Sequence, residues 1–467
     1  MTRRPPPTAL APCTGHARRR LPFGAAMLAG LGGGVAKAQT PMSAPAVPAG
    51  DIAWMMTSSA LVLLMVVGLA FFYGGLVRRK NVLNTMMMSF VSLGVVGLTF
   101  AAVGYSLAFS GRSAIVGSLA HVGLRGLALG GGSGLPGLLA FAFQATFAMI
   151  TAALISGAVV ERMRCGPYRL FIALWSVLVY APIAKWVWGG GFLQRLGALD
   201  FAGGTVVHIN AGVAAAVLAL VLGRRRDYGR KAMLPHQVPL TLLGAGLLWF
   251  GWFGFNAGSA QAADATAVLA FVNTLLAPAA TLVVWALLDL ARGGRATAVG
   301  LATGVVVGLV AITPAAGFVS PAGALAIGAL ATVPSYLLIL WRARSRLDDA
   351  LDVFSAHGIG GISGALLTGL FASKAWGAPV NGGLAQLGVQ ALAVVTAIGF
   401  SALGTLVIAR VLAAFTPLRA DADSEAQGLD VAMHGEEAYT DGEGALLMPV
   451  SRLEPKPAAV ATARSEA

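Results

Sequence analysis

Two histidines and one aspartate carry the chemistry that this sequence suggests. His208 follows the stretch LDFAGGTVV and His357 follows DVFSA, and each histidine lies within a long apolar segment. Ionisable side chains are costly inside a bilayer and usually mark a pathway or a binding site. A lone histidine on an apolar helix is more often a satisfied core residue, but two at related positions favour a function. As neutral rings, paired imidazoles can accept a hydrogen bond or relay a proton.

Asp200 stands eight residues before His208, a separation of about 12 Å along a helix axis. The carboxylate therefore cannot orient the imidazole directly. We expect it to cap the helix that follows and to favour a cation near the entrance. Metal binding is a weaker alternative, because the histidines lack His-x-x-x-His spacing and a third ligand near in sequence. No cofactor is expected, and no nucleophile with its base is found, so the sequence argues against an enzyme.

Composition places these residues in a membrane. The chain has 467 residues, of which 57% are hydrophobic and 11% charged, and its mean hydropathy is +0.78. No water-soluble core of ordinary size holds that much apolar surface. The 61 glycines indicate helices that pack closely through small residues. The net charge of +13 comes from short Arg and Lys clusters between apolar runs, so no nucleic-acid partner is expected.

Eleven apolar runs each have about the length needed to cross roughly 30 Å of hydrocarbon. They lie at Trp54–Val77, Leu83–Phe109, Leu135–Val160, Leu170–Trp188, Gly203–Leu222, Pro239–Phe255, Ala265–Leu290, Val299–Ala316, Pro321–Trp341, Phe354–Phe371 and Leu384–Phe415. The predicted fold class is therefore an all-α polytopic membrane protein with eleven transmembrane helices. Because the histidines lie five spans apart, we expect an inverted five-helix repeat of spans 1 to 5 and 6 to 10, plus a long last helix.

Basic residues orient the spans. Clusters at 78–80, 162–169, 224–231, 292–295 and 342–346 follow odd-numbered spans, whereas the other side of the membrane has only Arg112, Arg125, Lys185, Arg195 and Lys374. The positive-inside rule places the clusters in the cytoplasm. The leader HARRRLPFGAAMLAGLGGGVAKAQT is typical of a bacterial secretion signal. We expect an inner-membrane protein with a cleavable signal peptide (1–38), a short periplasmic segment (39–53), a transmembrane domain (54–415) and a cytoplasmic tail (416–467).

The tail is acidic, and such segments are by default solvated and without a role. The block GLDVAMHGEEAY is less repetitive than that default predicts. Binding of a partner by this block therefore stays open.

The stretches FFYGGLVRRKNVL, VWGGG, LDFAGGTVVHINAG, GWFGFNAGS, AFVNT and DVFSAHGIGGISG follow one another through the predicted spans. Together with GLDVAMHGEEAY they resemble the ammonium transporter (Amt/Rh) family, bacterial Amt branch. The resemblance implies a homotrimer whose subunits each contain a narrow hydrophobic pore for ammonium or ammonia. By motif, it implies recruitment by Trp188, Ser259, Phe143 and Phe147, a gate of Phe147 and Phe255, a pore lined by His208 and His357, and Asp200 as an acid needed for conduction.

These residue types suit that task. Aromatic faces attract ammonium by cation–π contact worth up to about 2 kcal/mol when desolvated, and the Ser259 hydroxyl can accept one N–H bond. Beyond the gate a bare cation faces a Born cost of tens of kcal/mol. We therefore expect deprotonation at the outer site and passage of NH3 along the histidines, which excludes K+ because K+ has no proton to release. Plainer interpretations are an interfacial belt residue for Trp188, simple packing for the two phenylalanines, and a hydroxyl bonded back to its helix for Ser259.

Two features stand apart from this picture. Lys185, three residues before Trp188, departs from the family pattern and would repel ammonium if it pointed into the vestibule; we expect it to snorkel outward.

A second function is nitrogen sensing, in which the tail and loops such as Arg224–Arg226 signal to a PII-type regulatory partner.

Overall fold

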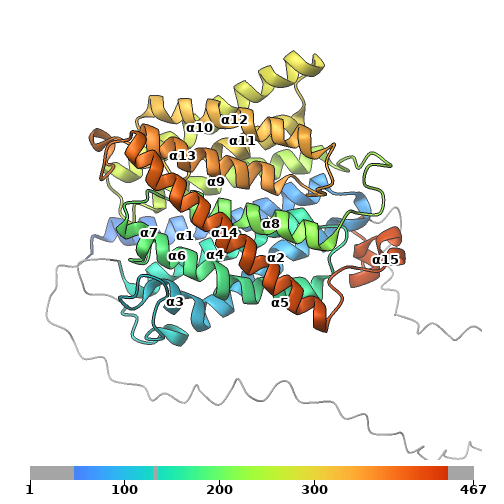
Figure 1. Cartoon of the computed structure of the whole chain (residues 1–467), viewed down its shortest axis with the longest axis horizontal. Helices are drawn as coiled ribbons and strands as arrows, with labels where there is room; N and C mark the ends of the chain where they lie inside the picture. Colours follow the sequence, from blue (N-terminus) through green and yellow to red (C-terminus); the bar gives the residue numbers. More distant parts are fainter. Residues whose placement is uncertain (1–46, 130–134, 440–467) are drawn as a thin grey trace, which may run out of the picture. The chain divides into compact units, whose positions relative to one another are not determined.

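A computed structural model describes residues 47–129 and 135–439, which belong to one compact unit and form a helical bundle (Figure 1). Seven spans are single helices: α1 (Ala49–Leu76), α4 (Gly137–Val159), α9 (Val238–Gly258), α10 (Ala265–Gly293), α11 (Ala298–Ile312), α12 (Pro321–Arg342) and α14 (Leu384–Phe415). Four are built from consecutive pieces: α2 (Val82–Thr99), η2 (Phe100–Gly104) and α3 (Tyr105–Phe109); α5 (Cys165–Trp175), η4 (Ser176–Tyr180) and α6 (Ala181–Val187); η5 (Gly204–Ile209) and α8 (Asn210–Leu222); η6 (Phe354–Ile359) and α13 (Gly360–Phe371).

The predicted all-α multi-pass architecture is confirmed, with one span shorter than expected. Ten helical segments of the described chain are long and apolar enough to cross a membrane. The eighth, α11, has 15 residues rather than the run to Ala316. Pro314 follows its end, and a proline has no backbone N–H with which to continue the helical ladder.

The helices α1 and α9 pack along their whole length and run in opposite directions. A Cβ added to Gly75 would lie 2.6 Å from the backbone nitrogen of Thr241, and one added to Gly258 would lie 2.7 Å from the Cβ of Ser58. The end of α1 thus meets the start of α9, and its start meets the end of α9. These helices begin the two expected halves, so their antiparallel packing agrees with an inverted repeat.

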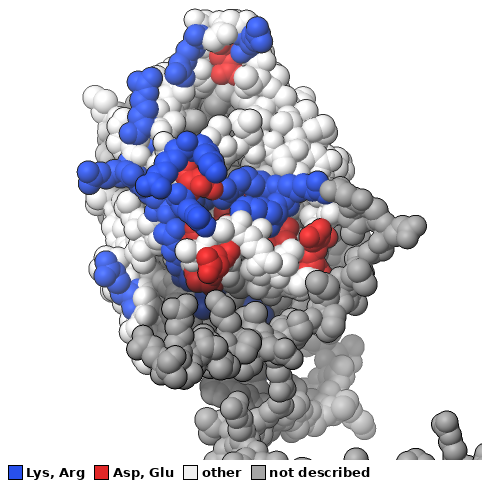
Figure 2. Space-filling model, turned by 90° about the vertical axis from the view of Figure 1, so that its right-hand side faces the viewer, with Lys and Arg blue, Asp and Glu red and all other residues white. Residues whose placement is uncertain are grey.

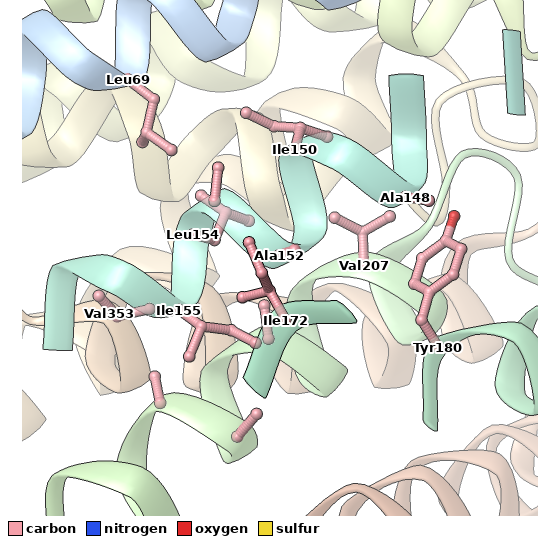
Figure 3. Packing of buried hydrophobic residues seen from close by; sticks show 14 of the residues in the cluster. Leu69, Ala148, Ile150, Ala152, Leu154, Ile155, Ile172, Tyr180, Val207 and Val353 are labelled. Atoms are coloured by element: carbon pink, nitrogen blue, oxygen red, sulfur yellow. The ribbon is translucent and has the colours of Figure 1, made fainter. Parts of the chain in front are cut away.

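Apolar side chains fill the space between the spans. Figure 3 shows one part of this core, where Leu69 of α1, Ile150 and Leu154 of α4, Ile172 of α5 and Val207 of η5 lie together. All five side chains are nearly or fully buried. Since lipid supplies little hydrophobic drive between helices, close packing of this kind holds the bundle together.

Lys and Arg side chains gather on one end of the bundle (Figure 2). We call this end the basic face; Arg79, Arg224, Arg226 and Arg230 are exposed there, and Arg78 and Arg225 form ion pairs beneath them. Arg225 pairs with Glu161 at 3.0 Å and with Asp348 at 2.8 Å. Burial alone would raise the pKa of Glu161, but the guanidinium groups of Arg225 and Arg78 outweigh it and hold the pKa below its usual value. These ion pairs neutralise part of the positive charge and connect the segments that follow α1, α4, α8 and α12.

Within the described residues, the tail packs against the bundle up to Tyr439, whereas its composition predicts a solvated segment by default. It contains the helical pieces α15 (Ala422–Gln427) and η8 (Asp430–His434). The Asp430 carboxylate accepts from the backbone nitrogens of Leu83 and Asn84, at 3.0 and 2.8 Å, near the start of α2. The Tyr439 hydroxyl donates to Gln237 at 2.6 Å. The tail packs on the basic face because it supplies acceptors for a helix start that has no cap of its own.

The expected signal peptide (1–38), residues 39–46 and the extension after Tyr439 lie outside the described residues.

Candidate functional site

The two histidines meet at the centre of the bundle. The Nδ1 atoms of His208 and His357 lie 3.3 Å apart, and the rings are stacked at 25° with their centroids 5.3 Å apart. Both side chains are buried, with exposed fractions of 1% and 4%. A hydrogen bond between two Nδ1 atoms requires one to donate and the other to accept, so neutral rings of opposite tautomers fit this geometry. His208 Nε2 has no partner within the described residues, which leaves one ring nitrogen available to a guest.

Irregular helix starts position both rings. η5 and η6 are π-helical, and each carries one histidine. An added Cβ on Gly212 would lie 2.3 Å from the backbone nitrogen of Gly358, and one on Gly361 would lie 3.1 Å from the Cβ of His208. The fifth and tenth spans therefore cross at near backbone contact, and only glycines at the crossing allow the imidazoles to touch.

The Asp200 carboxylate caps η5, as expected. Its Oδ1 accepts from the backbone nitrogens of Gly203 (2.8 Å) and Gly204 (2.6 Å). Its Oδ2 accepts from those of Thr205 (2.8 Å) and Val206 (3.1 Å). Four backbone donors that the helix start leaves unpaired are thus satisfied by one buried side chain. In the other half, the Asp349 carboxylate accepts from the backbone nitrogen of Phe354 at 2.7 Å.

A row of aromatic rings leads to the histidines. Phe147 and Phe255 stack at 25° with centroids 4.1 Å apart, and Phe255 lies 5.9 Å from the His208 ring. Trp188 meets Phe147 edge-on at 5.9 Å. The order along the row is therefore Trp188, Phe147, Phe255, His208 and His357. The structure brings together these five residues from five different spans.

Phe143 and Ser259 lie next to the stacked Phe147 and Phe255. The Phe143 ring is 4.8 Å from that of Phe147. The Ser259 hydroxyl donates to the Phe255 carbonyl at 2.9 Å, so the bond back to its own helix, which was the plainer interpretation of this residue, is present. This bond uses the proton of the hydroxyl and leaves its lone pairs free to accept from a guest.

Trp252 belongs to the row although the sequence analysis did not single it out. Its ring stacks on His208 at 5.3 Å and 22°, and its Nε1 donates to the Thr313 hydroxyl at 2.9 Å. It lies three residues before Phe255 in GWFGFNAGS, which places both rings on one helix face. This three-residue spacing from Phe255 was the feature of the sequence that could have identified Trp252 as a member of the row.

Lys185 does not snorkel outward, and that expectation was wrong. Its side chain is 1% exposed. The ammonium donates to the carbonyls of Ser110 and Gly111 at 3.1 and 3.0 Å. These carbonyls follow the end of α3, where unpaired backbone oxygens favour a cation.

A cavity of about 430 Å³ begins at His357 and reaches the basic face. Tyr73, Arg78, Glu161, Arg225 and Asp352 contribute to its lining. The histidine pair therefore separates the aromatic row from a polar vestibule. Within the described residues, no group of three or more His, Cys, Asp or Glu side chains is arranged to hold a metal ion.

Comparisons with known proteins agree with this geometry. The family model described as Ammonium Transporter Family matches residues 53–439. The chain is 49% identical to an ammonium transporter of Aquifex aeolicus over 398 residues, which cover 84% of this chain and 93% of that protein. A crystal structure of Saccharomyces cerevisiae Mep2 superposes with a TM-score of 0.75 at 37% identity, covering 80% and 88% of the two chains. A structure titled Sensor Amt Protein superposes with a TM-score of 0.78 at 30% identity, covering 82% and 98%. The match over residues 53–439 and the similarity to these transporters, in agreement with the histidine pair and the aromatic row, show that this chain belongs to the ammonium transporter family.

Proposed function

We propose that the chain transports ammonium across the membrane by passing it through the pore as ammonia. Ammonium is held at Trp188 and Ser259, in a vestibule that Phe143 helps to line. It loses a proton there and passes as NH3 between Phe147 and Phe255 to the histidine pair. The observation that carries this proposal is the Nδ1–Nδ1 contact of 3.3 Å between buried rings at the end of the aromatic row.

Electrostatics explains why the proton must be left behind. A bare monovalent cation in so dry a passage costs tens of kcal/mol. Each aromatic face returns on the order of 2 kcal/mol when the cation is desolvated, and neutral imidazoles carry no compensating charge. Neutral NH3 avoids the Born cost and can hydrogen-bond to the unpaired Nε2 of His208. K+ has the same charge and cannot shed it, so selectivity follows from the chemistry of the guest.

The sidedness of this pathway follows from charge. We place the basic face in the cytoplasm and the Trp188 end in the periplasm, because the Arg and Lys clusters obey the positive-inside rule. In this arrangement the protein is an inner-membrane protein with a periplasmic N-terminus, a cleaved signal peptide at 1–38 and a cytoplasmic tail at 416–467. The exposed apolar side chains on the helices then face lipid or the other subunits of a homotrimer.

Transport is tested with the purified protein in liposomes. Ammonium flux and current are recorded together after a jump to ammonium, and then after a jump to K+ at the same concentration. We expect saturable ammonium flux and no K+ current above empty liposomes. Equal currents for the two ions, or no ammonium flux, would contradict the proposed passage as ammonia. The ratio of charge to flux also tells whether the released proton crosses by a separate route.

Ammonium sensing is a second candidate, and the docked tail favours it. Asp430 bonds to the start of α2, and Tyr439 bonds to Gln237, directly before α9. In addition, Lys80 donates to the Glu425 carbonyl at 3.0 Å. A PII-type regulatory protein would meet this tail and the loop at Arg224–Arg226 on the same face. In this proposal, occupancy of the pore is read through the tail.

Deleting residues 428–439 separates the two functions. If the protein signals through its tail, the deletion abolishes binding of a PII-type protein while ammonium flux in liposomes is kept. Binding is measured on immobilised full-length and shortened protein. Retained binding by the shortened protein would exclude the tail as the signalling element.

A further inference from the structure

Lys185 is a buried cation placed one turn before Trp188. It lies in α6, and its ammonium donates to the carbonyls of Ser110 and Gly111 and to no other acceptor among the described residues. None of the ion pairs of the described residues includes Lys185. A charge is rarely buried without a carboxylate unless its hydrogen bonds have a structural purpose.

The carbonyls that it binds end the second span. Ser110 and Gly111 directly follow α3, and Gly111 has a φ of +69°, a left-handed conformation that glycine adopts without strain. The turn at Gly111 directs both carbonyls to one point, where the ammonium of Lys185 caps the negative end of the helix. This contact fastens α3 to α6.

Three more hydrogen bonds join the same two segments. Trp186 Nε1 donates to the Ile115 carbonyl at 2.7 Å, the backbone nitrogen of Phe192 to the Ala114 carbonyl at 3.0 Å, and Arg195 to the Arg112 carbonyl at 2.8 Å. We call these bonds, with those of Lys185, the 110–195 clasp. In Figure 1 the segments lie at the end of the bundle that carries α3, α6 and α7 (Phe192–Arg195), opposite α15.

Trp188 is set between this clasp and the aromatic row. The next residue, Gly189, packs so closely on α3 that an added Cβ would lie 2.0 Å from the Ala108 carbonyl. On the other side, Trp188 Nε1 donates to the Asp200 carbonyl at 2.8 Å, and its ring meets Phe147. The clasp therefore positions the backbone of Trp188, and the hydrogen bond to the Asp200 carbonyl positions its indole ring.

We propose that Lys185 is the positioning residue of the cation site at Trp188: by tying the end of α3 to α6, it holds the indole edge-on to Phe147. The inference rests on the proposed transport function, since it assigns the residue that sets the geometry of the recruiting ring. Lys185 acts through Trp188 and does not touch the guest.

The test is a double-mutant cycle on ammonium transport in liposomes. Lys185→Met keeps most of the apolar stem and removes the donors, and it is expected to raise KM about tenfold with kcat little changed. Lys185→Arg restores donors to the same carbonyls and is expected to recover most of the affinity. In a Trp188→Ala background, Lys185→Met is expected to change KM by less than about twofold, because the ring that it positions is gone.

Controls separate this inference from the proposed function and from misfolding. Arg125→Met removes a surface cation whose Nε bonds within its own loop, to the Val122 carbonyl at 3.1 Å, and should leave KM unchanged. If Lys185→Met does not fold, Arg195→Met loosens the clasp from its exposed rim and should raise KM about two- to threefold. Unchanged KM in Trp188→Ala would refute the cation site itself. Raised KM in Trp188→Ala with unchanged or lowered KM in Lys185→Met would refute only the positioning role, and so would an equal effect of Lys185→Met in both backgrounds.

Discussion

Replacing His208 with aspartate is expected to let K+ through a pore that otherwise rejects it. The new carboxylate would stand beside His357, in place of a neutral ring whose Nδ1 lies 3.3 Å from its partner. A fixed negative charge offsets part of the Born cost that excludes cations. We expect the ratio of K+ to ammonium current in liposomes to rise at least about tenfold, equivalent to about 1.4 kcal/mol of selectivity. The passage of NH3 is impaired at the same time, because the imidazole that receives it is lost.

The control for this variant is His121→Asp. His121 lies in a loop at the Trp188 end, where its Nδ1 is 3.0 Å from the Arg125 carbonyl, so the same change there should leave selectivity unaltered. The oligomeric state in detergent should match the unmodified protein for both variants. Full ammonium transport with intact exclusion of K+ by His208→Asp would show that the histidine pair does not discriminate between the ions.

Much of the fold was predictable because each span carries its own signal. The last span was predicted at its observed limits, Leu384–Phe415, and most other ends agree within a few residues. The shortened α11 was not predicted, because the apolar run continues through Pro314 to Ala316 and hydropathy does not register the missing N–H. The π-helical form of η5 and η6 could not be predicted from the sequence either, since it depends on the crossing of two spans that are distant in the sequence.

The site was predictable in its residues but not in all of its contacts. His208 and His357 could be paired because buried ionisable groups are rare in a membrane and these two stand at corresponding places. The position of the Lys185 side chain was predicted wrongly because its partners are backbone carbonyls 74 and 75 residues away. Backbone acceptors cannot be identified from the types of the side chains in a sequence. The packing of the tail could not be predicted for a similar reason. The Asp430 carboxylate accepts hydrogen bonds from backbone nitrogens of α2, whereas composition indicates only that the tail is charged.

Replacing Asp200 with asparagine is expected to reduce ammonium transport at least about tenfold and to lower thermal stability. The loss of stability, and part of the loss of transport, come from the cap of η5. One oxygen becomes an NH2 group, which then faces two backbone donors that it cannot accept from. Each buried donor left unsatisfied costs about 1–3 kcal/mol, so the start of the helix that carries His208 loosens. Loss of the buried charge also removes the attraction for a cation arriving at Trp188, whose Nε1 donates to the Asp200 carbonyl at 2.8 Å.

Asp264→Asn is the matched control, because Asp264 caps α10 by accepting from Ala267 at 2.9 Å and contacts no member of the aromatic row. Removing that charge should weaken one helix start by about 0.5–2 kcal/mol and leave transport unchanged. Thermal unfolding and ammonium flux measured on both variants separate stability from conduction. If Asp200→Asn lost stability but transported at the unmodified rate, the carboxylate would be only a cap. A loss of flux in Asp200→Asn well beyond that of an equally destabilised Asp264→Asn would place Asp200 in conduction, through its charge or through the helix start that it caps for His208, because Asp264 caps a helix that carries no residue of the row.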